Sequence, residues 1–318
     1  MHRPDYIKLI NAAAAPLGIT TEHLSDNWAI RLSKDGVTRF IVGNTFPLND
    51  SPCYKIVGNK NLCSDILTAS KIANVPHQVL FSPSVLVRRH SNKGNSEIIA
   101  RFIRENGFPV LVKRNNSSKG EGVYLVGSEA ELENVLSKIY VADSSLCLSP
   151  YRENIREYRN IILDGKCLLS YEKRRPFVIG DGKSSMLALL SEFAHSKVGN
   201  GEKLGKLFDA LVKDRMIYVP RDKEEVFLHW KHNRFPGTTY ETVSCPEMEQ
   251  LAIAAADAVA ARFTSVDIIR SEKHGYEVLE MSASVIIHYP MIYSKTATKY
   301  EGAVGIYQAA LNAIFPPK

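Results

Sequence analysis

The chain has no long apolar run and no Cys-x-x-Cys pair, and these absences narrow its class. Its 318 residues contain five scattered cysteines, Cys53, Cys63, Cys147, Cys167 and Cys245. The odd number and the spacing argue against a disulfide framework and against structural zinc. The alanine-rich stretch from Ala252 to Ala261 is too short, and too interrupted by Asp257, to cross a bilayer. We expect it to form a helix that packs on a sheet.

Long basic blocks are also missing. Residues Met1–Asp5 lead into a polar helix, so we expect no signal peptide. The formal net charge of +6 is modest, and no Lys/Arg run is long enough for a nucleic-acid arm. Hydrophobic residues make up 45% of the chain, enough for a sizeable core in two or three packed units. We expect a cytoplasmic protein that binds neither nucleic acid nor membrane; whether it forms a homo-oligomer stays open.

Two apolar segments near the C-terminus, Ser265–Ile269 and Tyr276–Glu280, flank a predicted turn at Arg270–Gly275. A hairpin symmetric about Lys273 and His274 pairs four sets of residues: Ile268 with Leu279, Ile269 with Val278, Arg270 with Glu277, and Asp267 with Glu280. Like charges directly opposite each other destabilise a sheet. A bound Mg²⁺, which takes one or two carboxylates, would relieve this repulsion. The alternative is a register shifted by one residue, with both acids in water.

A second candidate site follows a buried strand that ends at Lys113. The polar loop Asn116–Gly122 comes next, and then another strand. Glycines permit positive φ and a close approach, so successive N–H groups of such a loop can turn onto one anion. The charges of Lys113 and Lys119 strengthen a phosphate site here; an ordinary hairpin with a solvated basic tip is the alternative. The loop lacks the spacing of a P-loop.

This order of strand, lysine, glycine-rich loop and strand, with an Asp and a Glu on late strands, resembles the ATP-grasp superfamily. Within it, the chain resembles the group that holds cyanophycin synthetase, the C-terminal half of bifunctional glutathione synthetases and the ribosomal-protein glutamate ligases. The resemblance runs from about Asn59 to Pro317 and rests on these segments: Asn59–Lys60 with Asn74–Pro76, Glu157–Lys166, Arg174–Ser185 and Glu280–Ser282. It implies an α/β (α+β) ATP-grasp fold, in which two α+β subdomains clasp ATP.

Several positions depart from the family's pattern. Ser282 stands where the family has Asn, and Lys231 and Thr238 replace an Arg and a Gly. His288–Pro290 is one residue shorter than the trailing His-x-x-Pro. Lys and Arg are not interchangeable at a bidentate phosphate site, so these changes point to an altered substrate or a damaged catalyst. Five residues of the family's pattern are present and favour an active enzyme: Lys60, Lys113, Arg159, Asp267 and Glu280.

The resemblance implies a role for each nucleotide-binding residue. Lys60 and Lys113 would neutralise the α- and β-phosphates of ATP. The loop would close over the β- and γ-phosphates with Ser118, Lys119, Gly120 and Gly122. The segment from Ser149 to Tyr151 would lie along the edge of the adenine ring. Either Glu153 or Glu157 would bind the ribose, and the sequence does not choose between them.

The same resemblance implies the metal and catalytic residues. Asp267 and Glu280 would hold Mg²⁺, with Ser282 or Asn233 completing the site. Arg159, assisted by Arg174 or Arg175, would grip a substrate carboxylate or acyl phosphate, while Lys231 would face phosphate. For Arg159, the alternative is a surface salt bridge with Glu157 or Asp164.

The implied reaction is ATP-dependent joining of a carboxylate to an amine through an acyl phosphate, on amino acids or short peptides. The competing interpretation is a non-catalytic nucleotide-binding or partner-binding protein on a degenerate ATP-grasp fold. Its support lies in Ser282, Lys231 and Thr238. The intact carboxylate pair argues against it.

We expect three units: an N-terminal unit over residues 1–58 and two ATP-grasp subdomains over 59–150 and 151–318. The strongest helix signals span Asp5–Leu17, Lys60–Ala73, Glu97–Asn106 and Ser128–Ile139. Gly18 and Gly107 would end two of these helices. In the N-terminal unit, the expected strands are Trp28–Leu32 and Thr38–Val42.

Overall fold

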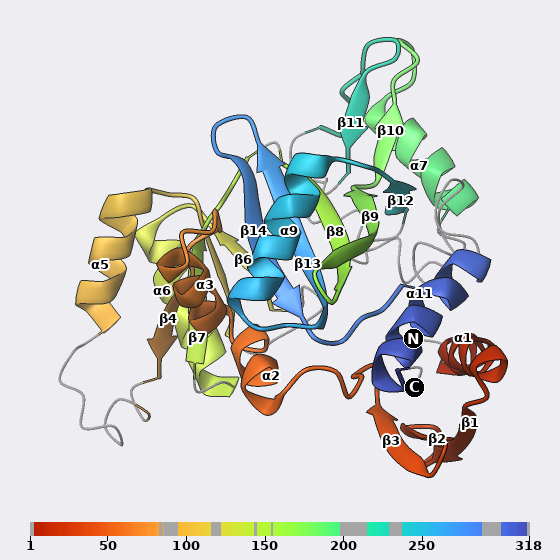
Figure 1. Cartoon of the computed structure of the whole chain (residues 1–318). Coiled ribbons are helices and arrows are strands. Elements are labelled where there is room, and N and C mark those ends of the chain that lie inside the picture. Colours follow the sequence, from red (N-terminus) through yellow and green to blue (C-terminus); the bar gives the residue numbers. More distant parts are fainter. Residues whose placement is uncertain are drawn as a thin grey trace.

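A computed structural model of the chain describes residues 3–82, 85, 95–115, 122–142, 145–153, 155–197, 215–228, 237–287 and 300–316. These residues form four β-sheets with helices packed against them (Figure 1). The expected α+β class is confirmed. No helix within these ranges is both long and apolar enough to cross a membrane.

The largest sheet has five antiparallel strands in the order β12-β9-β8-β13-β14. Their bounds are Arg156–Leu163 for β8, Lys166–Arg174 for β9, Thr239–Thr242 for β12, Phe263–Ser271 for β13 and Gly275–Ser282 for β14. Helix α9 (Pro246–Ala258) lies across one face of this sheet (Figure 1). Its buried Met248 and Ala252 share a core with Val266 and Ile268 of β13. The predicted alanine-rich helix on a sheet is therefore confirmed.

The β13–β14 hairpin pairs Asp267 with Glu280, as predicted, although the rest of the predicted register is wrong. The strands turn over Glu272–His274, so Ser271 pairs with Gly275, and Ile268 pairs with Val278. A β-bulge then leaves Leu279 without a partner and shifts the register by one residue. The predicted pairs of Ile268 with Leu279, Ile269 with Val278 and Arg270 with Glu277 therefore do not form.

The four-stranded sheet has the order β4-β7-β5-β6. Its strands are Gln78–Phe81 for β4, Val110–Arg114 for β5, Tyr124–Val126 for β6 and Ser145–Pro150 for β7. Helices α5 (Asn95–Asn106) and α6 (Glu129–Ala142) bury one face, where Val112 and Leu148 lie. Because side chains alternate along a strand, Lys113, Cys147 and Ser149 lie on the opposite face.

The predicted start of α6 is confirmed at atomic level. The Ser128 hydroxyl accepts a hydrogen bond from the Glu131 amide at 3.3 Å, and the Glu131 carboxylate accepts one from the Gly127 amide at 2.8 Å. This reciprocal arrangement satisfies amides that a helix start leaves without partners. Gly107, which follows α5, has φ +72, a conformation that favours glycine.

The N-terminal unit contains α1 (Arg3–Ala14), the 3₁₀ turn η1 (Ala15–Leu17) and a three-stranded sheet. Its strands are Thr20–Leu24 for β1, Ala29–Lys34 for β2 and Val37–Val42 for β3. Gly18 ends the predicted first helix in the left-handed conformation, whereas β1 was not predicted. The C-terminal helix α11 (Tyr300–Ile314) lies beside α1 (Figure 1). Tyr6, Phe46, Phe263 and Tyr307 share one core, so both ends of the chain meet the five-stranded sheet.

Two short helices connect this unit to the rest. Helix α2 (Ser51–Val57) begins after Asp50, whose carboxylate caps it by accepting a hydrogen bond from the Cys53 amide. Helix α3 (Lys60–Ala69) starts at the predicted residue and is capped by Asn59. It ends four residues before the predicted end at Ala73. The chain then extends along β14, where the Val75 amide donates a hydrogen bond to the Val278 carbonyl at 2.9 Å.

A fourth, two-stranded sheet lies at the top of Figure 1 and consists of β10 (Phe177–Ile179) and β11 (Glu225–Phe227). The Gly-Asp-Gly-Lys-Ser segment follows β10 and leads into α7 (Met186–Lys197). Asp181 accepts hydrogen bonds from the Lys183 and Ser184 amides at 2.8 and 2.7 Å. Gly180 lies so close to the next loop that an added Cβ would be 2.2 Å from the Arg221 carbonyl oxygen.

We therefore expect Gly180→Ala to destabilise the protein by more than about 2 kcal/mol, because backbone must move to admit a methyl group. Chemical unfolding of the whole chain measures this. Gly305→Ala is the matched control: a Cβ there meets nothing within 4 Å, and alanine in a helix is about 0.5–1 kcal/mol better than glycine. Equal stabilities for the two variants would contradict the close approach at Gly180.

Candidate active site

The five-stranded sheet carries a group of charged side chains on the face opposite α9. This group is called the charged half of the sheet. Strand alternation and the observed register put Glu157, Arg159, Lys173, Asp267 and Glu280 on this face. Further along the same face the residues become apolar and join the core with α1 and α11. The polar residues thus occupy one end of an otherwise buried surface.

Asp267 is the centre of a buried ionic network. Arg159 donates to both of its oxygens, from Nε and Nη2, at 2.7 Å each. Lys173 Nζ donates to Asp267 at 2.8 Å and to Glu157 at 2.6 Å. Asp267 is only 2% exposed, so the shifted register with both acids in water is excluded. A bidentate guanidinium–carboxylate pair is among the strongest hydrogen-bonded contacts in proteins.

The network keeps Asp267 ionised. Burial alone would raise the pKa of this carboxyl, but Arg159 and Lys173 outweigh burial and lower the pKa to about 2. Burial and Arg159 lower the pKa of Lys173, but Asp267 and Glu157 raise it by more. The pKa of Lys173 therefore lies above its ordinary value. The three groups are therefore charged together at neutral pH.

Glu280 is the more accessible member of the acidic pair. Its side chain is 32% exposed, and its carboxylate lies 3.7 Å from Lys60 Nζ of α3. Arg159, Lys173 and Lys60 together neutralise Asp267 and Glu280. The repulsion between the two opposed acids, from which the sequence predicted a metal ion, is therefore already relieved by these three cations. The fold needs no metal ion to hold Asp267 opposite Glu280.

Lys113 approaches this charged half from the four-stranded sheet. It is 6% exposed, and no ion pair to it is found within the described ranges. Burial lowers its pKa, whereas Cys147, Glu280 and, more weakly, Glu157 raise it. A buried ammonium without a carboxylate partner is costly, and it is a ready partner for a phosphate.

Two polar atoms on the Lys113 face also lack partners among the residues the structure describes: Ser149 Oγ and His77 Nε2. The His77 Nδ1 lies 2.8 Å from the Val75 carbonyl, which can only accept, so Nδ1 carries the proton and Nε2 presents a lone pair. Burial lowers the pKa of His77 far below its usual value, with Lys113 as the next cause. Buried polar atoms without partners are uncommon, so this face fits a polar ligand.

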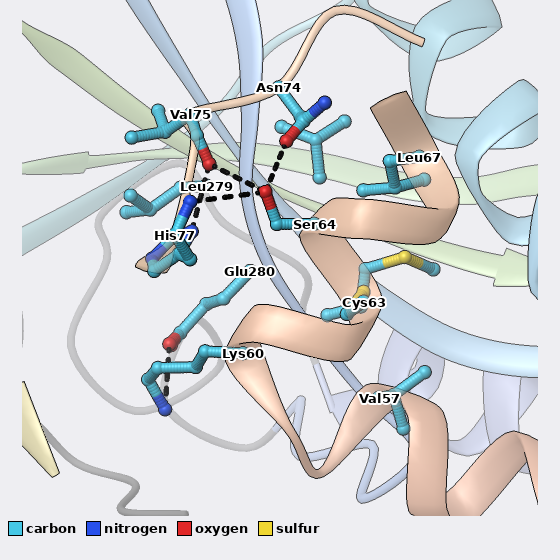
Figure 2. A pocket seen from close by; sticks show the side chains of 12 residues that line it. Val57, Lys60, Cys63, Ser64, Leu67, Asn74, Val75, His77, Leu279 and Glu280 are labelled. Carbon is cyan, nitrogen blue, oxygen red and sulfur yellow. Dashed lines mark hydrogen bonds and ion pairs between the residues drawn. The ribbon is translucent and has the colours of Figure 1, made fainter. Parts of the chain in front are cut away.

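His77 also lines a small cavity between α3 and β14, shown in Figure 2. Lys60, Ser64 and Glu280 line the same cavity, and Ser64 Oγ donates to Asn74 Oδ1 at 2.7 Å. The volume of about 20 Å³ holds about one water molecule. The cavity is thus too small for a nucleotide.

The tertiary structure gathers most of the predicted site residues that it describes. One cluster holds Lys60, Lys113, Glu157, Arg159, Asp267 and Glu280. Ser282 lies on the same face as Glu280 and pairs with Ser265. Tyr151 and Arg175 lie close enough that each affects the pKa of the other.

Other predicted residues lie apart from this cluster or outside the described ranges. Arg174 turns toward Glu225 and Glu241 and is paired with both. Glu153 is exposed, and Gly122 takes the positive φ expected of the loop, +66. Ser118, Lys119, Gly120, Lys231, Asn233 and His288 lie outside the described residues.

Lys173 and Arg152 were missed by the sequence reasoning. Lys173 bridges Glu157 and Asp267, and Arg152 donates to both oxygens of Glu277 at 2.9 and 2.8 Å. A second bulge, between Ile161 and Ile162, brings Lys173 opposite Glu157. An unbulged β8–β9 hairpin would place Glu172 there, so no signal in the sequence pattern identifies Lys173.

Comparison with known proteins identifies the fold. No protein-family profile and no curated protein sequence matches the chain. Among solved structures, a bifunctional glutathione synthetase from Pasteurella multocida matches with a TM-score of 0.56 and 17% identity, over 96% of this chain and 44% of that chain. A D-alanine–D-alanine ligase from Bacillus anthracis matches with a TM-score of 0.51 and 16% identity, over 84% of this chain and 68% of that chain.

Both similar structures are ATP-grasp ligases, and the same Bacillus anthracis enzyme complexed with ATP matches with a TM-score of 0.50. The chain therefore has the ATP-grasp fold, as its motifs predicted. It spans less than half of the glutathione synthetase it resembles.

Proposed function

We propose that the chain is an ATP-dependent ligase that joins a carboxylate to an amine, on amino acids or short peptides. The observation that carries this proposal is the buried Lys113, which has no ion-pair partner among the described residues, together with Ser149 Oγ, which has no hydrogen-bond partner among them. Glu280 of the five-stranded sheet is close enough to raise the pKa of Lys113. These groups suit a ligand that is anionic at one end and polar at the other, as a nucleoside triphosphate is. The similar structures include an ATP complex, which supports the same assignment.

In this proposal each sheet supplies part of the nucleotide site. Lys113 and Lys60 neutralise phosphate oxygens, and Lys60 can leave Glu280 because their 3.7 Å contact is long for an ion pair. Ser149 and the backbone toward Tyr151 edge the base. Glu157 or Glu153 binds the ribose; Glu157 is held by Lys173, whereas Glu153 is exposed.

Phosphoryl transfer requires positioning and charge neutralisation rather than a covalent enzyme intermediate. The substrate carboxylate attacks the γ-phosphorus, ADP leaves, and the amine then displaces phosphate from the acyl phosphate. Arg159 uses Nε and Nη2 on Asp267, so N–H groups remain on its 21% exposed side chain for the tetrahedral oxyanion. Asp267 and Lys173 fix the orientation of this guanidinium.

The carboxylates present also fit Mg²⁺, which prefers oxygen ligands and keeps several waters and phosphate oxygens. Glu280 would be its main protein ligand, with one remaining acceptor position of Asp267 and the neighbouring Ser282. Bound there, Mg²⁺ would neutralise charge on the phosphates.

A second candidate function is a non-catalytic nucleotide-binding protein on the same fold. One observation favours it: Asp267 already accepts three hydrogen bonds from cationic side chains, which limits its capacity as a metal ligand. The two functions agree on ATP binding and differ on turnover.

We expect ATP to raise the stability of the protein in the presence of Mg²⁺, and only weakly without it. A ligand that binds only the native state adds roughly 2.7 kcal/mol at a hundredfold excess over its Kd. Melting curves with ATP and EDTA, ATP and Mg²⁺, and Mg²⁺ alone measure this. Unchanged melting in all arms would reject the nucleotide site.

ADP formation then separates the two candidate functions. Pooled amino acids and dipeptides, each as free acids, supply both carboxylates and amines. Release of ADP that depends on the pool supports the ligase. Stabilisation by ATP without pool-dependent ADP release supports the non-catalytic alternative.

A further inference from the structure

A buried histidine, His77, directly precedes β4 and has no part in the proposed chemistry. Gln78, the first residue of β4, pairs with Leu148 of β7. Continued by one residue, this register puts His77 opposite Ser149, and opposed residues of neighbouring strands share a face of the sheet. Ser149 lies on the face of Lys113, so His77 lies on that face as well.

The His77 ring can only accept a hydrogen bond at Nε2. Its Nδ1 lies 2.8 Å from the Val75 carbonyl oxygen, which cannot donate, so Nδ1 carries the proton. Burial, and then Lys113, lower the pKa of His77 well below its usual range, so the ring is neutral at pH 7. Nε2 is buried and has no hydrogen-bond partner among the described residues. Such an acceptor is unfavourable unless a ligand or a water molecule donates to it.

Ser149 supplies the complementary group. Its side chain is 0% exposed, and its hydroxyl also lacks a partner within the described part of the chain. A hydroxyl can donate as well as accept. The Cβ atoms of opposed residues lie about 4.5–5.5 Å apart, so one ligand group can reach both side chains. His77 and Ser149 therefore offer an acceptor and a donor side by side.

The position of His77 connects this pair to the proposed nucleotide site. His77 lines one cavity together with Lys60 and Glu280, which are proposed to serve the phosphates and Mg²⁺ (Figure 2). Its neighbour Ser149 is proposed to contact the base. Adenine presents an amino group that donates beside a ring nitrogen that accepts, whereas guanine has a carbonyl oxygen in place of the amino group. The His77–Ser149 pair matches the adenine pattern.

We propose that His77 is a specificity-determining residue of the nucleotide site, whose Nε2 accepts a hydrogen bond from the amino group of adenine. The Ser149 hydroxyl donates to the neighbouring ring nitrogen. This inference rests on the proposed function. A base with a carbonyl oxygen at that position would set two acceptors against each other, and its nucleotide binds more weakly. The other possible occupant is a water molecule in the small cavity, which would give His77 a structural role only.

The binding of two matched nucleotides tests this role without requiring turnover. Calorimetric titration of the full chain with Mg²⁺ gives the Kd of ATP and of inosine triphosphate (ITP), which has a carbonyl oxygen in place of the amino group. The wild type should bind ATP about 10–100-fold more tightly than ITP. Equal Kd values would overturn the inference and leave the nucleotide site standing. If neither nucleotide binds, the proposed function fails, and the inference fails with it.

Variants of His77 separate recognition of the base from a structural role. His77→Phe keeps an aromatic ring without the acceptor, so it should raise the Kd of ATP about 10–100-fold and change that of ITP little. His77→Gln keeps an acceptor oxygen and should retain part of the preference. His274→Phe, in the exposed β13–β14 turn, is the matched control and should keep the wild-type ratio. An equal weakening of ATP and ITP binding in His77→Phe, or an unchanged ratio, would overturn the inference.

Nitrogen NMR of the histidine rings in the wild type covers the case in which His77→Phe does not fold. The resonance of His77 Nε2 should shift when ATP binds, because the lone pair then accepts a hydrogen bond. ITP offers no donor at that position and should not reproduce the shift. The same response to ATP and ITP would contradict the assignment.

Discussion

Asp267→Asn is expected to lower the free energy of unfolding by about 3–5 kcal/mol, because it leaves the buried Lys173 and the partly buried Arg159 without their shared carboxylate. Arg159 and Lys173 both contact Asp267 at 2.7–2.8 Å, and Lys173 is 2% exposed. The amide can accept hydrogen bonds but carries no charge. ADP formation should fall with stability, since Arg159 loses its orientation. Chemical unfolding of both proteins at pH 7 measures the difference in the free energy of unfolding.

The same substitution predicts a change in acid sensitivity. The pKa of Asp267 is about 2 in the folded protein and about 3.9 in an unfolded chain. The carboxylate therefore contributes stability above about pH 4, and the contribution is lost as the pH falls from about 4 toward 2. The stability difference between wild type and Asp267→Asn should shrink over that interval.

Asp257→Asn provides the control for removing one negative charge. Asp257 lies on α9 and is exposed, so the effect should stay within about 0.5 kcal/mol. A wild-type-like stability of Asp267→Asn would show that the ionic network contributes little to the fold.

Lys113→Met is expected to change stability and nucleotide binding in opposite directions. Removing a buried ammonium without an ion-pair partner in the described ranges should stabilise the free protein by about 1–3 kcal/mol. Removing a cation from a phosphate site should raise the Kd for ATP by about 10–100-fold. Methionine has a similar length and flexibility, which limits cavity formation. Unfolding curves and calorimetric titration with ATP and Mg²⁺ measure both effects.

The pH dependence of the first effect has a defined sign. Because burial lowers the pKa of folded Lys113, the folded state binds fewer protons than the unfolded state between that pKa and about 10.4. The wild type should gain stability relative to Lys113→Met as the pH rises through this range. Lys138→Met, on an exposed position of α6, should change neither stability nor binding. Loss of stability in Lys113→Met would mean that the ammonium is paired.

Local sequence patterns determined many elements of the fold. The capping residues of α6, Gly18 after the first helix and the alanine-rich α9 were predictable because each depends on neighbours within a few positions. The motifs around Lys60, Lys113, Arg159 and Glu280 predicted the ATP-grasp fold that the comparisons show. The extra strand β1 was missed because its burial is slight and irregular.

The hairpins show where such patterns stop being sufficient. The turn of the β13–β14 hairpin is one residue shorter than expected, which shifts the register of the first pairs by one residue. The bulge at Leu279 shifts the register back, so Glu280 still pairs with Asp267. A one-residue change in register moves a side chain to the other face of a sheet. The bulge at Leu168 of β9 likewise puts Lys173, rather than Glu172, opposite Glu157. Bulges depend on the packing of both faces, and the sequence of one strand does not encode that packing.

By itself, the sequence determined the fold class and the residue types gathered at the site: two lysines, an arginine and an opposed acidic pair. Only the tertiary structure decided how these charges are balanced. Asp267 forms ion pairs with Arg159 and Lys173. Arg174 forms ion pairs with Glu225 and Glu241. Lys113 and Arg175 have no carboxylate partner in the described ranges. The physical reason is that ion pairing depends on distances of a few ångströms between separate strands and sheets, whereas sequence spacing constrains only neighbours along the chain.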